Sequence, residues 1–388
     1  MRRRLSLALG SLLFIATALL RAGDPPHTPE QVGTEMLDKF HEVGDLFHDQ
    51  VSYVKGEGSE IYFSADALWL RRDLTRLQLP TTSFGVGGPI IAQLQDLHFV
   101  YEAGLQMTAG YRCDPWWSVE GTYFGLQQWN DVVTVNDPQG RLFGVLNKFG
   151  TVQQPIFPSP PLPPTFGTGN NTTSQSGGYS SRINNFEVNV VRDLLAFNLS
   201  ANPDGAKVEF AALAGARYLR LVENFFVATS GDIIPLAGIN DPSAFANYNI
   251  DVENNLFGGQ IGGRMTMQME RLTLGVESKV ALLADGAKQR SSVVFHFAQP
   301  LEINGQIPGG ASDLRSSVLG QIDTTADYDL TSHIRLRAGF EVMWLNGRAL
   351  APDQIDGSVA QTNMLRPILN NRGTTRYYGS FGGVEIHF

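Results

Sequence analysis

The stretch Phe99–Tyr111, FVYEAGLQMTAGY, alternates along its whole length. Its odd-numbered residues are apolar, whereas the even-numbered ones include Glu102, Gln106 and Thr108. A period of two indicates a β-strand with one face against an apolar environment. Strands of soluble sandwiches are usually about five or six residues long, whereas a tilted strand that crosses a bilayer needs about 9–11. The length of this stretch therefore favours a membrane-spanning strand.

The same pattern recurs along the chain, for example in FGGQIGGRMTMQM (Phe257–Met269) and IRLRAGFEVMW (Ile334–Trp344). It predicts strands near 60–72, 97–112, 116–128, 183–200, 206–222, 255–268, 272–284, 317–330, 334–345 and 374–388. These ten segments predict an all-β fold, a closed antiparallel transmembrane β-barrel. The count becomes twelve if FFVATS (Phe225–Ser230) and SSVVFHF (Ser291–Phe297) form separate spanning strands instead of extending their neighbours.

The predicted connections alternate between tight and long. Tight turns are expected at 113–116, 202–205, 269–271 and 330–333. Long polar or Pro-rich connections are expected at 73–96, 129–182, 223–254, 285–316 and 346–373. Bacterial outer-membrane barrels combine short periplasmic turns with long external loops. The alternation and the even strand number therefore predict that both ends of the barrel lie on the periplasmic side.

The chain begins like an exported protein. Three arginines precede an apolar run from Leu5 to Leu20, and small residues follow at Ala22 and Gly23. This predicts a signal peptide over 1–22, with a retained membrane anchor as the alternative. Residues 23–59 are expected to form a periplasmic segment with a short amphipathic helix, and the barrel is expected to occupy 60–388.

Composition excludes several function classes. The net charge of −9 argues against nucleic acid as a partner. The single cysteine, Cys113, rules out an intrachain disulfide. No G-x-S-x-G, H-E-x-x-H, P-loop or EF-hand pattern is present, so no catalytic residue, metal site or cofactor is predicted.

The last strand carries a candidate assembly signal. In YYGSFGGVEIHF, Tyr378, Val384, Ile386 and the terminal Phe388 share one face. An alternating last strand with a final Phe is similar to the signal that outer-membrane assembly machinery recognises. The expected location is therefore the outer membrane, with its lipids and the barrel assembly machinery as partners.

Several blocks resemble a known family, a large planctomycete group of β-barrel porins, class seven. The resemblance rests on SADALWLRRD (Ser64–Asp73), LAGARYLRL (Leu213–Leu221), NNLFGGQIGGR (Asn254–Arg264), SKVAL (Ser278–Leu282), DLTSHIRLRAGFEVMWLNGRALAPDQID (Asp329–Asp356) and the final GGVEIHF. It covers roughly residues 60–388. In the eighth predicted strand, 317–330, analogy with this family leads us to expect a Pro-Glu pair, and the chain instead has Gln321-Ile322-Asp323. The resemblance implies an outer-membrane barrel and supplies no catalytic or binding residues.

If the apolar face meets lipid, the alternation points many charged residues inward. The expected acids are Asp66, Glu102, Glu120, Glu187, Glu209, Glu277, Asp323, Asp327, Glu341 and Glu385, and the expected bases are Lys207, Arg217, Arg264, Lys279, Arg335 and Arg337. A ten-stranded barrel is only slightly wider than the eight-stranded kind, so opposite charges inside it should pair.

The charges favour a structural or surface-loop display role with at most a narrow pathway that favours cations. The alternative is a porin-type diffusion channel for small solutes, and a second alternative is a membrane-embedded hydrolase. Small solutes or extracellular ligands at the long loops are further expected partners.

Overall fold

The computed structural model describes residues 60–73, 80–145, 149, 171–199, 206–234, 239–298, 302–356 and 369–388. The predicted signal peptide, the segment 23–59 with its amphipathic helix, and the turn 202–205 lie outside the described residues. No helix within the described ranges is long and apolar enough to cross a membrane.

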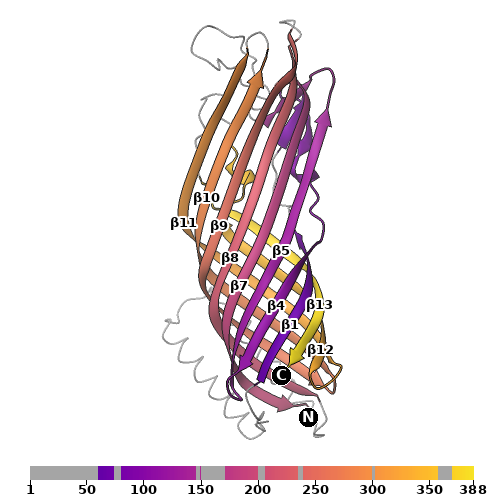
Figure 1. Cartoon of the computed structure of the whole chain (residues 1–388), viewed down its shortest axis with the longest axis vertical. Helices are drawn as coiled ribbons and strands as arrows, with labels where there is room; N and C mark the ends of the chain where they lie inside the picture. The colour runs from indigo at the N-terminus through magenta and orange to yellow at the C-terminus, as the bar shows by residue number, and fades with distance from the viewer. Residues whose placement is uncertain are drawn as a thin grey trace, which may run out of the picture. The chain divides into compact units, whose positions relative to one another are not determined.

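The described chain is built of β-strands whose ladders close into a ring (Figure 1). The ring strands are β1 (Glu60–Arg72), β4 (Glu102–Arg112), β5 (Trp117–Asn136), β7 (Thr172–Asn198), β8 (Lys207–Ile234), β9 (Ile239–Met269), β10 (Leu272–Phe297), β11 (Ile303–Asp329), β12 (Ile334–Arg348) and β13 (Gly373–His387). Neighbours pair antiparallel, and the pairing of β1 with β13 joins the first and last strands. The predicted all-β class and closed antiparallel ring are confirmed, and the ring of the described part passes through ten strands.

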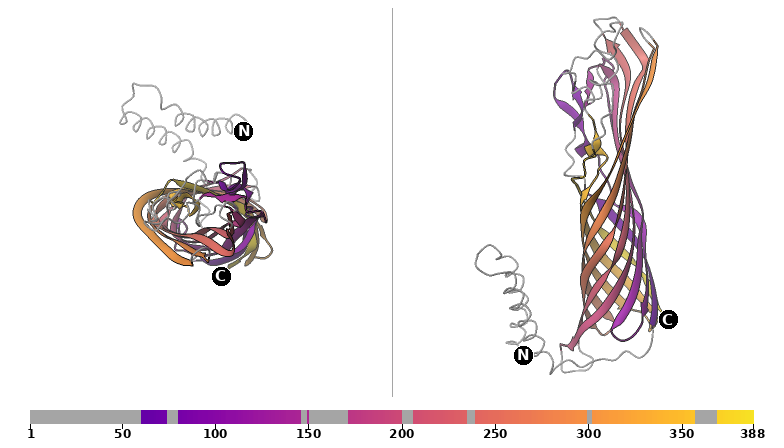
Figure 2. Two further views of the ribbon diagram at one scale, coloured as in Figure 1. Left: turned by 90° about the horizontal axis from the view of Figure 1, so that it is seen from above. Right: turned by 90° about the vertical axis from the view of Figure 1, so that its left-hand side faces the viewer.

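Five strands are far longer than expected. β7 to β11 have 26 to 31 residues each, whereas β12 and β13 have 15, so the long strands extend well beyond the short ones (Figures 1 and 2). The predicted long loops at 223–254 and 285–316 are therefore mostly strand. Phe225–Ser230 and Ser291–Phe297 extend β8 and β10 instead of forming separate strands. Continuous ladders between long neighbours stabilise polar stretches that have little strand propensity of their own.

The strand around Phe99 is shorter than its alternation predicts. β4 begins only at Glu102, and Phe99 is buried, with its ring 5.3 Å from that of Tyr179. The expectation that Phe99 lies on the lipid-facing side is wrong. The Phe99 side chain packs against the buried ring of Tyr179, and an alternation of apolar and polar residues does not show this contact.

The described tight turns, the first described residues and the end of the last strand lie at one end of the ring, here called the turn end. The pairs Glu60↔Arg112 and Tyr62↔His387 join the described start of the chain to the first tight turn and to the last strand. Leu330 N–H bonds to Ile334 O at 3.0 Å, and Leu199 N–H bonds to Ala206 O at 2.8 Å. The opposite end, from which β7 to β11 project, is here called the long-strand end.

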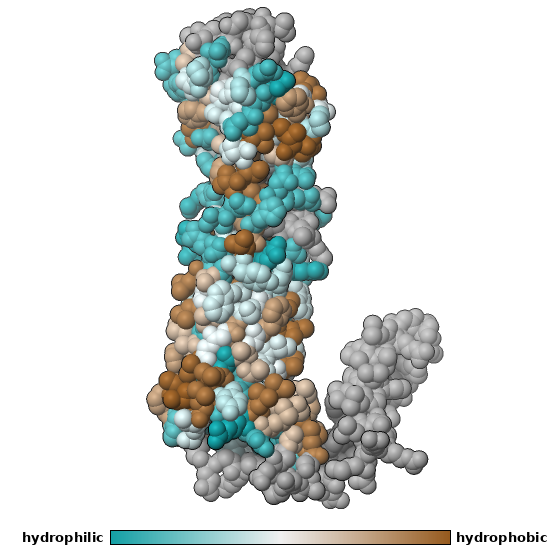
Figure 3. Space-filling view, turned by 90° about the vertical axis from the view of Figure 1, so that its right-hand side faces the viewer, coloured by the Kyte–Doolittle hydropathy of each residue, from teal (hydrophilic) through white to brown (hydrophobic). Residues whose placement is uncertain are grey.

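An apolar belt surrounds the ring near the turn end. Aromatic residues lie at both of its borders: Tyr111, Trp116, Trp117, Tyr328 and Phe388 toward the turn end, and Trp69, Tyr218 and Trp344 toward the long-strand end. On β12 the belt spans Ile334 to Trp344, which is eleven residues. Beyond it the outer surface becomes polar, as in the exposed pair Arg220–Glu253 at 2.9 Å. Figure 3 shows on one face a mainly apolar lower part, a hydrophilic zone above it and further apolar side chains near the far end.

Short elements accompany the long strands. They are β2 (Pro80–Phe84), β3 (Ile90–Gln93) and β6 (Leu142–Gly144), and the 3₁₀ turns η1 (Leu94–Asp96) and η4 (Pro352–Gln354). β6 pairs with β7 at Leu142↔Thr172, so the predicted loops 73–96 and 129–182 contain ordered strand. Leu94, Leu97 and Leu350 belong to the buried apolar core.

Candidate functional site

A cavity of about 450 Å³ lies inside the ring toward the turn end, and it is here called the chamber. Every strand of the ring contributes to its wall, because alternate residues of each strand point inward. Nine carboxylate side chains and six Lys or Arg side chains line it, so the wall carries an excess of negative charge. A second cavity, of about 370 Å³, shares Glu60, Arg335 and His387 with the chamber and reaches the turn at 330–333.

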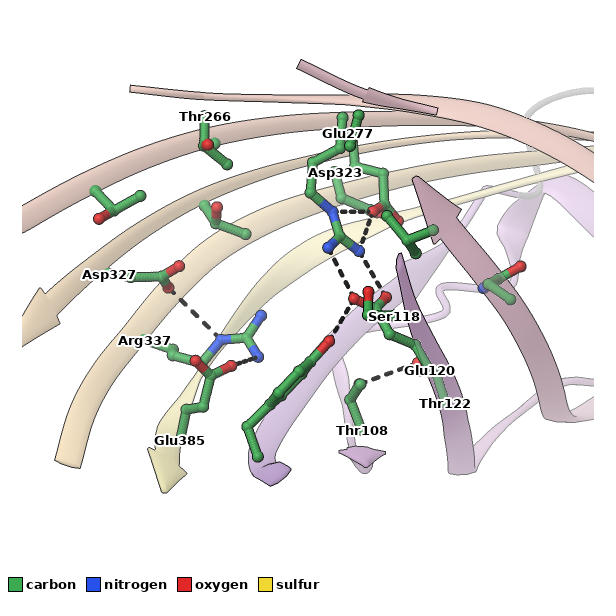
Figure 4. A pocket seen from close by; sticks show the side chains of 18 of the residues that line it. Thr108, Ser118, Glu120, Thr122, Thr266, Glu277, Asp323, Asp327, Arg337 and Glu385 are labelled. Atoms are coloured by element: carbon green, nitrogen blue, oxygen red, sulfur yellow. Dashed lines mark hydrogen bonds and ion pairs between the residues drawn. The ribbon is translucent and has the colours of Figure 1, made fainter. Parts of the chain in front are cut away.

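Arg264 on β9 pairs with two acids of the first ion-pair cluster, Glu120 and Glu277, which are labelled in Figure 4. Its Nη1 and Nη2 donate to the two carboxylate oxygens of Glu120 at 2.8 and 2.7 Å, and its Nε donates to Glu277 at 2.7 Å. The Tyr62 hydroxyl donates to Glu120 at 2.5 Å. A two-point contact between a guanidinium and a carboxylate fixes both side chains in one orientation. These groups connect β1, β5, β9 and β10 across the ring.

A deeper cluster closes the chamber on the side away from the turns. Lys279 Nζ lies 3.4 Å from Glu187 and 2.9 Å from Glu277. Arg217, which is 0% exposed, donates to Asn185 and to Gln321 at 2.6 Å each. Arg217, Glu187 and their amide partners are all buried, so the hydrogen-bonded groups of this layer are shielded from solvent.

A third cluster lies near the turn end, on β11, β12 and β13 (Figure 4). Arg337 bonds Glu385 at 2.9 Å and lies 3.5 Å from Asp327. Arg335 bonds Asp329 at 2.7 Å and the other Glu385 oxygen at 3.1 Å. Glu385 therefore holds both arginines, and removal of either arginine leaves it partly paired.

Beyond the Arg217 layer the interior becomes apolar. The inward residues there include Leu68, Leu70, Ile183, Leu219 and Leu345, each 0% exposed. The expectation that paired charges occupy the interior is therefore wrong for this layer, although buried charged residues such as Arg72 and Glu223 recur beyond it. Apolar side chains from facing strands fill a ring of this width, as in other small barrels.

The structure brings most of the sequence-predicted inward charges together in the three clusters and places five of them elsewhere. The three clusters contain Arg264, Glu120, Glu277, Lys279, Glu187, Arg217, Asp323, Asp327, Arg335, Arg337 and Glu385. Glu209 lines the chamber beside Lys207. Asp66 and Glu341 are buried, at 0% and 1% exposure. Glu102 stands opposite the interior residue Leu70 in the ladder, apart from the clusters.

Several polar residues of the site were not anticipated. Tyr62, Asn185, Gln260 and Gln321 complete the hydrogen bonds of the buried charges. All four share the inward parity of their strands, so the alternation that located the charges also identifies them. Among the described residues, no group of three or more His, Cys, Asp or Glu side chains is arranged to hold a metal ion.

The predicted assembly residues lie on the outer face. Val384 and Ile386 are each 38% exposed and Phe388 is 74% exposed, whereas Tyr378 is half-buried. The Phe388 N–H donates to Ile61 O at 2.9 Å, so the last residue is part of the β1–β13 seam.

No family model and no curated protein matches the chain. Among solved structures it is similar to the outer membrane protease OmpT from Escherichia coli, with 14% identity, a TM-score of 0.40, and coverage of 88% of this chain and 99% of that chain. It is also similar to the TodX deltaS2S3 mutant, a monoaromatic hydrocarbon channel, with 9% identity, a TM-score of 0.22, and coverage of 86% and 90%. A Pseudomonas aeruginosa FadL homologue has 5% identity, a TM-score of 0.23, and coverage of 86% and 90%. These likenesses are too distant to carry an argument about this chain, and the resemblance to the class-seven porin family stays a prediction.

Proposed function

We propose that the chain is a ten-stranded outer-membrane β-barrel that acts as a closed support for the long strands it projects. The observation that carries this proposal is the buried Arg217 layer, followed by the apolar layer of the long-strand half. Together they fill the ring, so the barrel has a structural and display role, with no diffusion path in this state.

The outer belt supports membrane insertion. Its borders are marked by aromatic residues, and its eleven residues on β12 match the roughly 9–11 residues of a bilayer-crossing strand. The polar outer surface above Tyr218, with Tyr218 bonded to Asn255 at 2.8 Å, fits the position where lipid headgroups end. The turn end then faces the periplasm, and β7 to β11 extend outward from the cell.

Assembly into the membrane is proposed to use the last strand. Tyr378, Val384, Ile386 and Phe388 present apolar side chains outward, where assembly machinery and then lipid can contact them. The N-terminal apolar run is proposed to act as the export signal.

Two measurements test the proposal. Membrane fractionation should recover the full chain with the outer membrane, and planar-bilayer recordings of the purified protein should show no sustained conductance. Recovery in the soluble periplasm would contradict the membrane assignment. Large, weakly selective conductance would contradict the closed lumen and favour the porin-type channel for small solutes.

A narrow pathway is the second candidate, and the chamber is the observation that favours it. Nine carboxylates against six Lys or Arg residues would attract cations into any water path that reaches the chamber. Small, cation-selective conductance would support this candidate. A catalytic role is not proposed, because the chamber's arginines and acids are already engaged with one another.

A further inference from the structure

The chain enters the ring immediately after β12. At Gly347 the backbone has a φ of +81°, which favours glycine, and the β12–β13 ladder shifts register between Asn346 and Arg348. Residues 349–356, here called the plug segment, follow this turn. Ala349, Leu350 and Ala351 are 0%, 2% and 0% exposed, so they lie inside the ring at the long-strand end, above the apolar layer.

Side chains of the opposite wall hold the backbone of the plug segment. The Asn254 amide on β9 accepts from Ala349 N–H at 3.0 Å and donates to Ala349 O at 2.8 Å. Glu223 on β8 accepts from Ala351 N–H at 2.9 Å. The Tyr248 hydroxyl accepts from Asp356 N–H at 3.1 Å. These contacts satisfy backbone groups that would otherwise be buried without partners.

The plug segment has no place in the strand ladders of the ring. β12 ends at Arg348 and β13 begins at Gly373, and the backbone bonds within the segment are local turns such as Asp353 N–H to Leu350 O at 3.1 Å. Its buried apolar residues are Ala349, Leu350, Ala351 and Pro352, with Ile355 packed against the core, so leaving the ring exposes less apolar surface than separating a ring strand would. Displacement of the segment thus breaks side-chain contacts and leaves the barrel ladders intact.

The closed arrangement also buries charged side chains that have no hydrogen-bond partner among the described residues. Arg348 is 0% exposed, and none of its three guanidinium nitrogens has a hydrogen-bond partner among the described residues. Both carboxylate oxygens of Asp285, which is 1% exposed, likewise have none in the described part. By contrast, Arg72 bonds Glu223 at 2.6 Å, and this pair holds the carboxylate in place for Ala351. Buried charged groups that lack hydrogen bonds are costly, and contact with water would relieve that cost.

We propose that residues 349–356 are a detachable plug, which Asn254, Glu223 and Tyr248 hold inside the ring and which leaves it without unfolding any ring strand. Departure of the plug opens a cup toward the outside, whose wall carries Arg72, Glu223, Arg348 and Asp285. The Arg217 layer and the apolar layer below remain in place, so the cup does not become a pore. This goes beyond the proposed support function, which requires only that those lower layers stay closed.

Hydrogen–deuterium exchange of the full chain in detergent, read by mass spectrometry, tests the plug. In the wild type, amides of 349–356 should exchange faster than those of β12 and β13, through an independent opening. Asn254→Ala removes both bonds to Ala349 and should raise exchange of the plug segment at least about ten-fold, with β12 and β13 unchanged. Arg348→Met removes this buried cation without hydrogen bonds and should slow exchange of the segment.

The matched control is Asn255→Ala, because Asn255 is the next residue on β9 and lies on the outer face beside Tyr218. It should leave plug exchange unchanged. If Asn254→Ala does not fold, Tyr248→Phe removes only one hydroxyl and should still accelerate exchange near Asp356. Equal exchange of the plug and the flanking strands in wild type and variants would overturn the proposal. Conductance is a separate readout. A conducting wild type contradicts the closed support function, whereas the exchange result alone tests whether residues 349–356 detach.

Discussion

Glu187 and Arg217 stand directly opposite each other in the β7–β8 ladder, yet the shortest contacts of each go elsewhere. Arg217 donates to Asn185 and Gln321 at 2.6 Å each, whereas its distance to Glu187 is 3.8 Å. Glu187 accepts from Gln260 at 2.5 Å. A two-strand pair has thus become a junction of β7, β8, β9 and β11, and its stability depends on the whole ring.

Replacing Arg217 with Met should destabilise the folded barrel. The change removes a fully buried cation from a network that includes Glu187, and breaking a buried pair typically costs about 3–5 kcal/mol. The midpoint of the heat-induced mobility shift on gels should fall accordingly. Arg220→Met on the same strand is the control, because Arg220 is exposed and its pair with Glu253 contributes at most about 1 kcal/mol. Equal effects of the two replacements would contradict the buried network.

Arg264 and Glu120 should show strong energetic coupling. Their two-point contact across the chamber makes each side chain depend on the other, so Arg264→Met and Glu120→Gln should each destabilise the barrel. The double variant should lose less than the sum of the single losses, with an interaction free energy of about 0.5–3 kcal/mol in a double-mutant cycle. Additive losses would mean that the contact does not form in the membrane.

Replacing both Arg335 and Arg337 with Ser should affect stability more than ion selectivity. Glu385 would lose both of its arginine partners, and Asp327 and Asp329 would lose theirs. Unfolding by guanidinium chloride should therefore begin at a lower concentration than for the wild type. As a control, Arg315→Ser removes an exposed arginine from β11 and should leave the midpoint nearly unchanged. A conducting double variant of unchanged stability would point to an open lumen.

Deleting Phe388 should reduce the amount of folded barrel in the membrane. The residue contributes an exposed aromatic ring and a backbone bond to Ile61 at the seam. Phe388→Tyr keeps both features and serves as the control, whereas Phe388→Asp should resemble the deletion. The yield of the heat-modifiable form in outer-membrane fractions measures assembly. Unchanged yield for the deletion would remove the assembly role.

The barrel wall could be predicted because the alternation of inward and outward residues along each strand is visible in the local sequence. Alternation identified the inward parity of residues such as Arg264, Glu277 and Glu385, and the tight turns fixed where most strands reverse. Which charges meet depends on register and strand tilt across the ring. Arg264 bonds Glu120 at a separation of 144 residues, and no local pattern contains that information.

The long-strand end could not be predicted for a different reason. Stretches such as Thr172–Ser181 are polar and rich in Gly and Ser, which locally indicates a loop. They become strand because each is bonded on both sides over many residues, with Gly178 covered by the Phe226 ring. Likewise, the inward turn at Gly347 follows from side chains on β8 and β9, about a hundred residues earlier in the chain.

The pairing of β1 with β13 also sets an order of events for biogenesis. The seam joins Tyr62 to His387, so the ring cannot close until the last strand has been synthesised and delivered. Until then β1 and β12 are open edges, each able to pair with a foreign strand. A chain truncated before β13 would keep both edges permanently exposed. Its sheet could not close into a ring, so it would stay accessible to quality-control proteases.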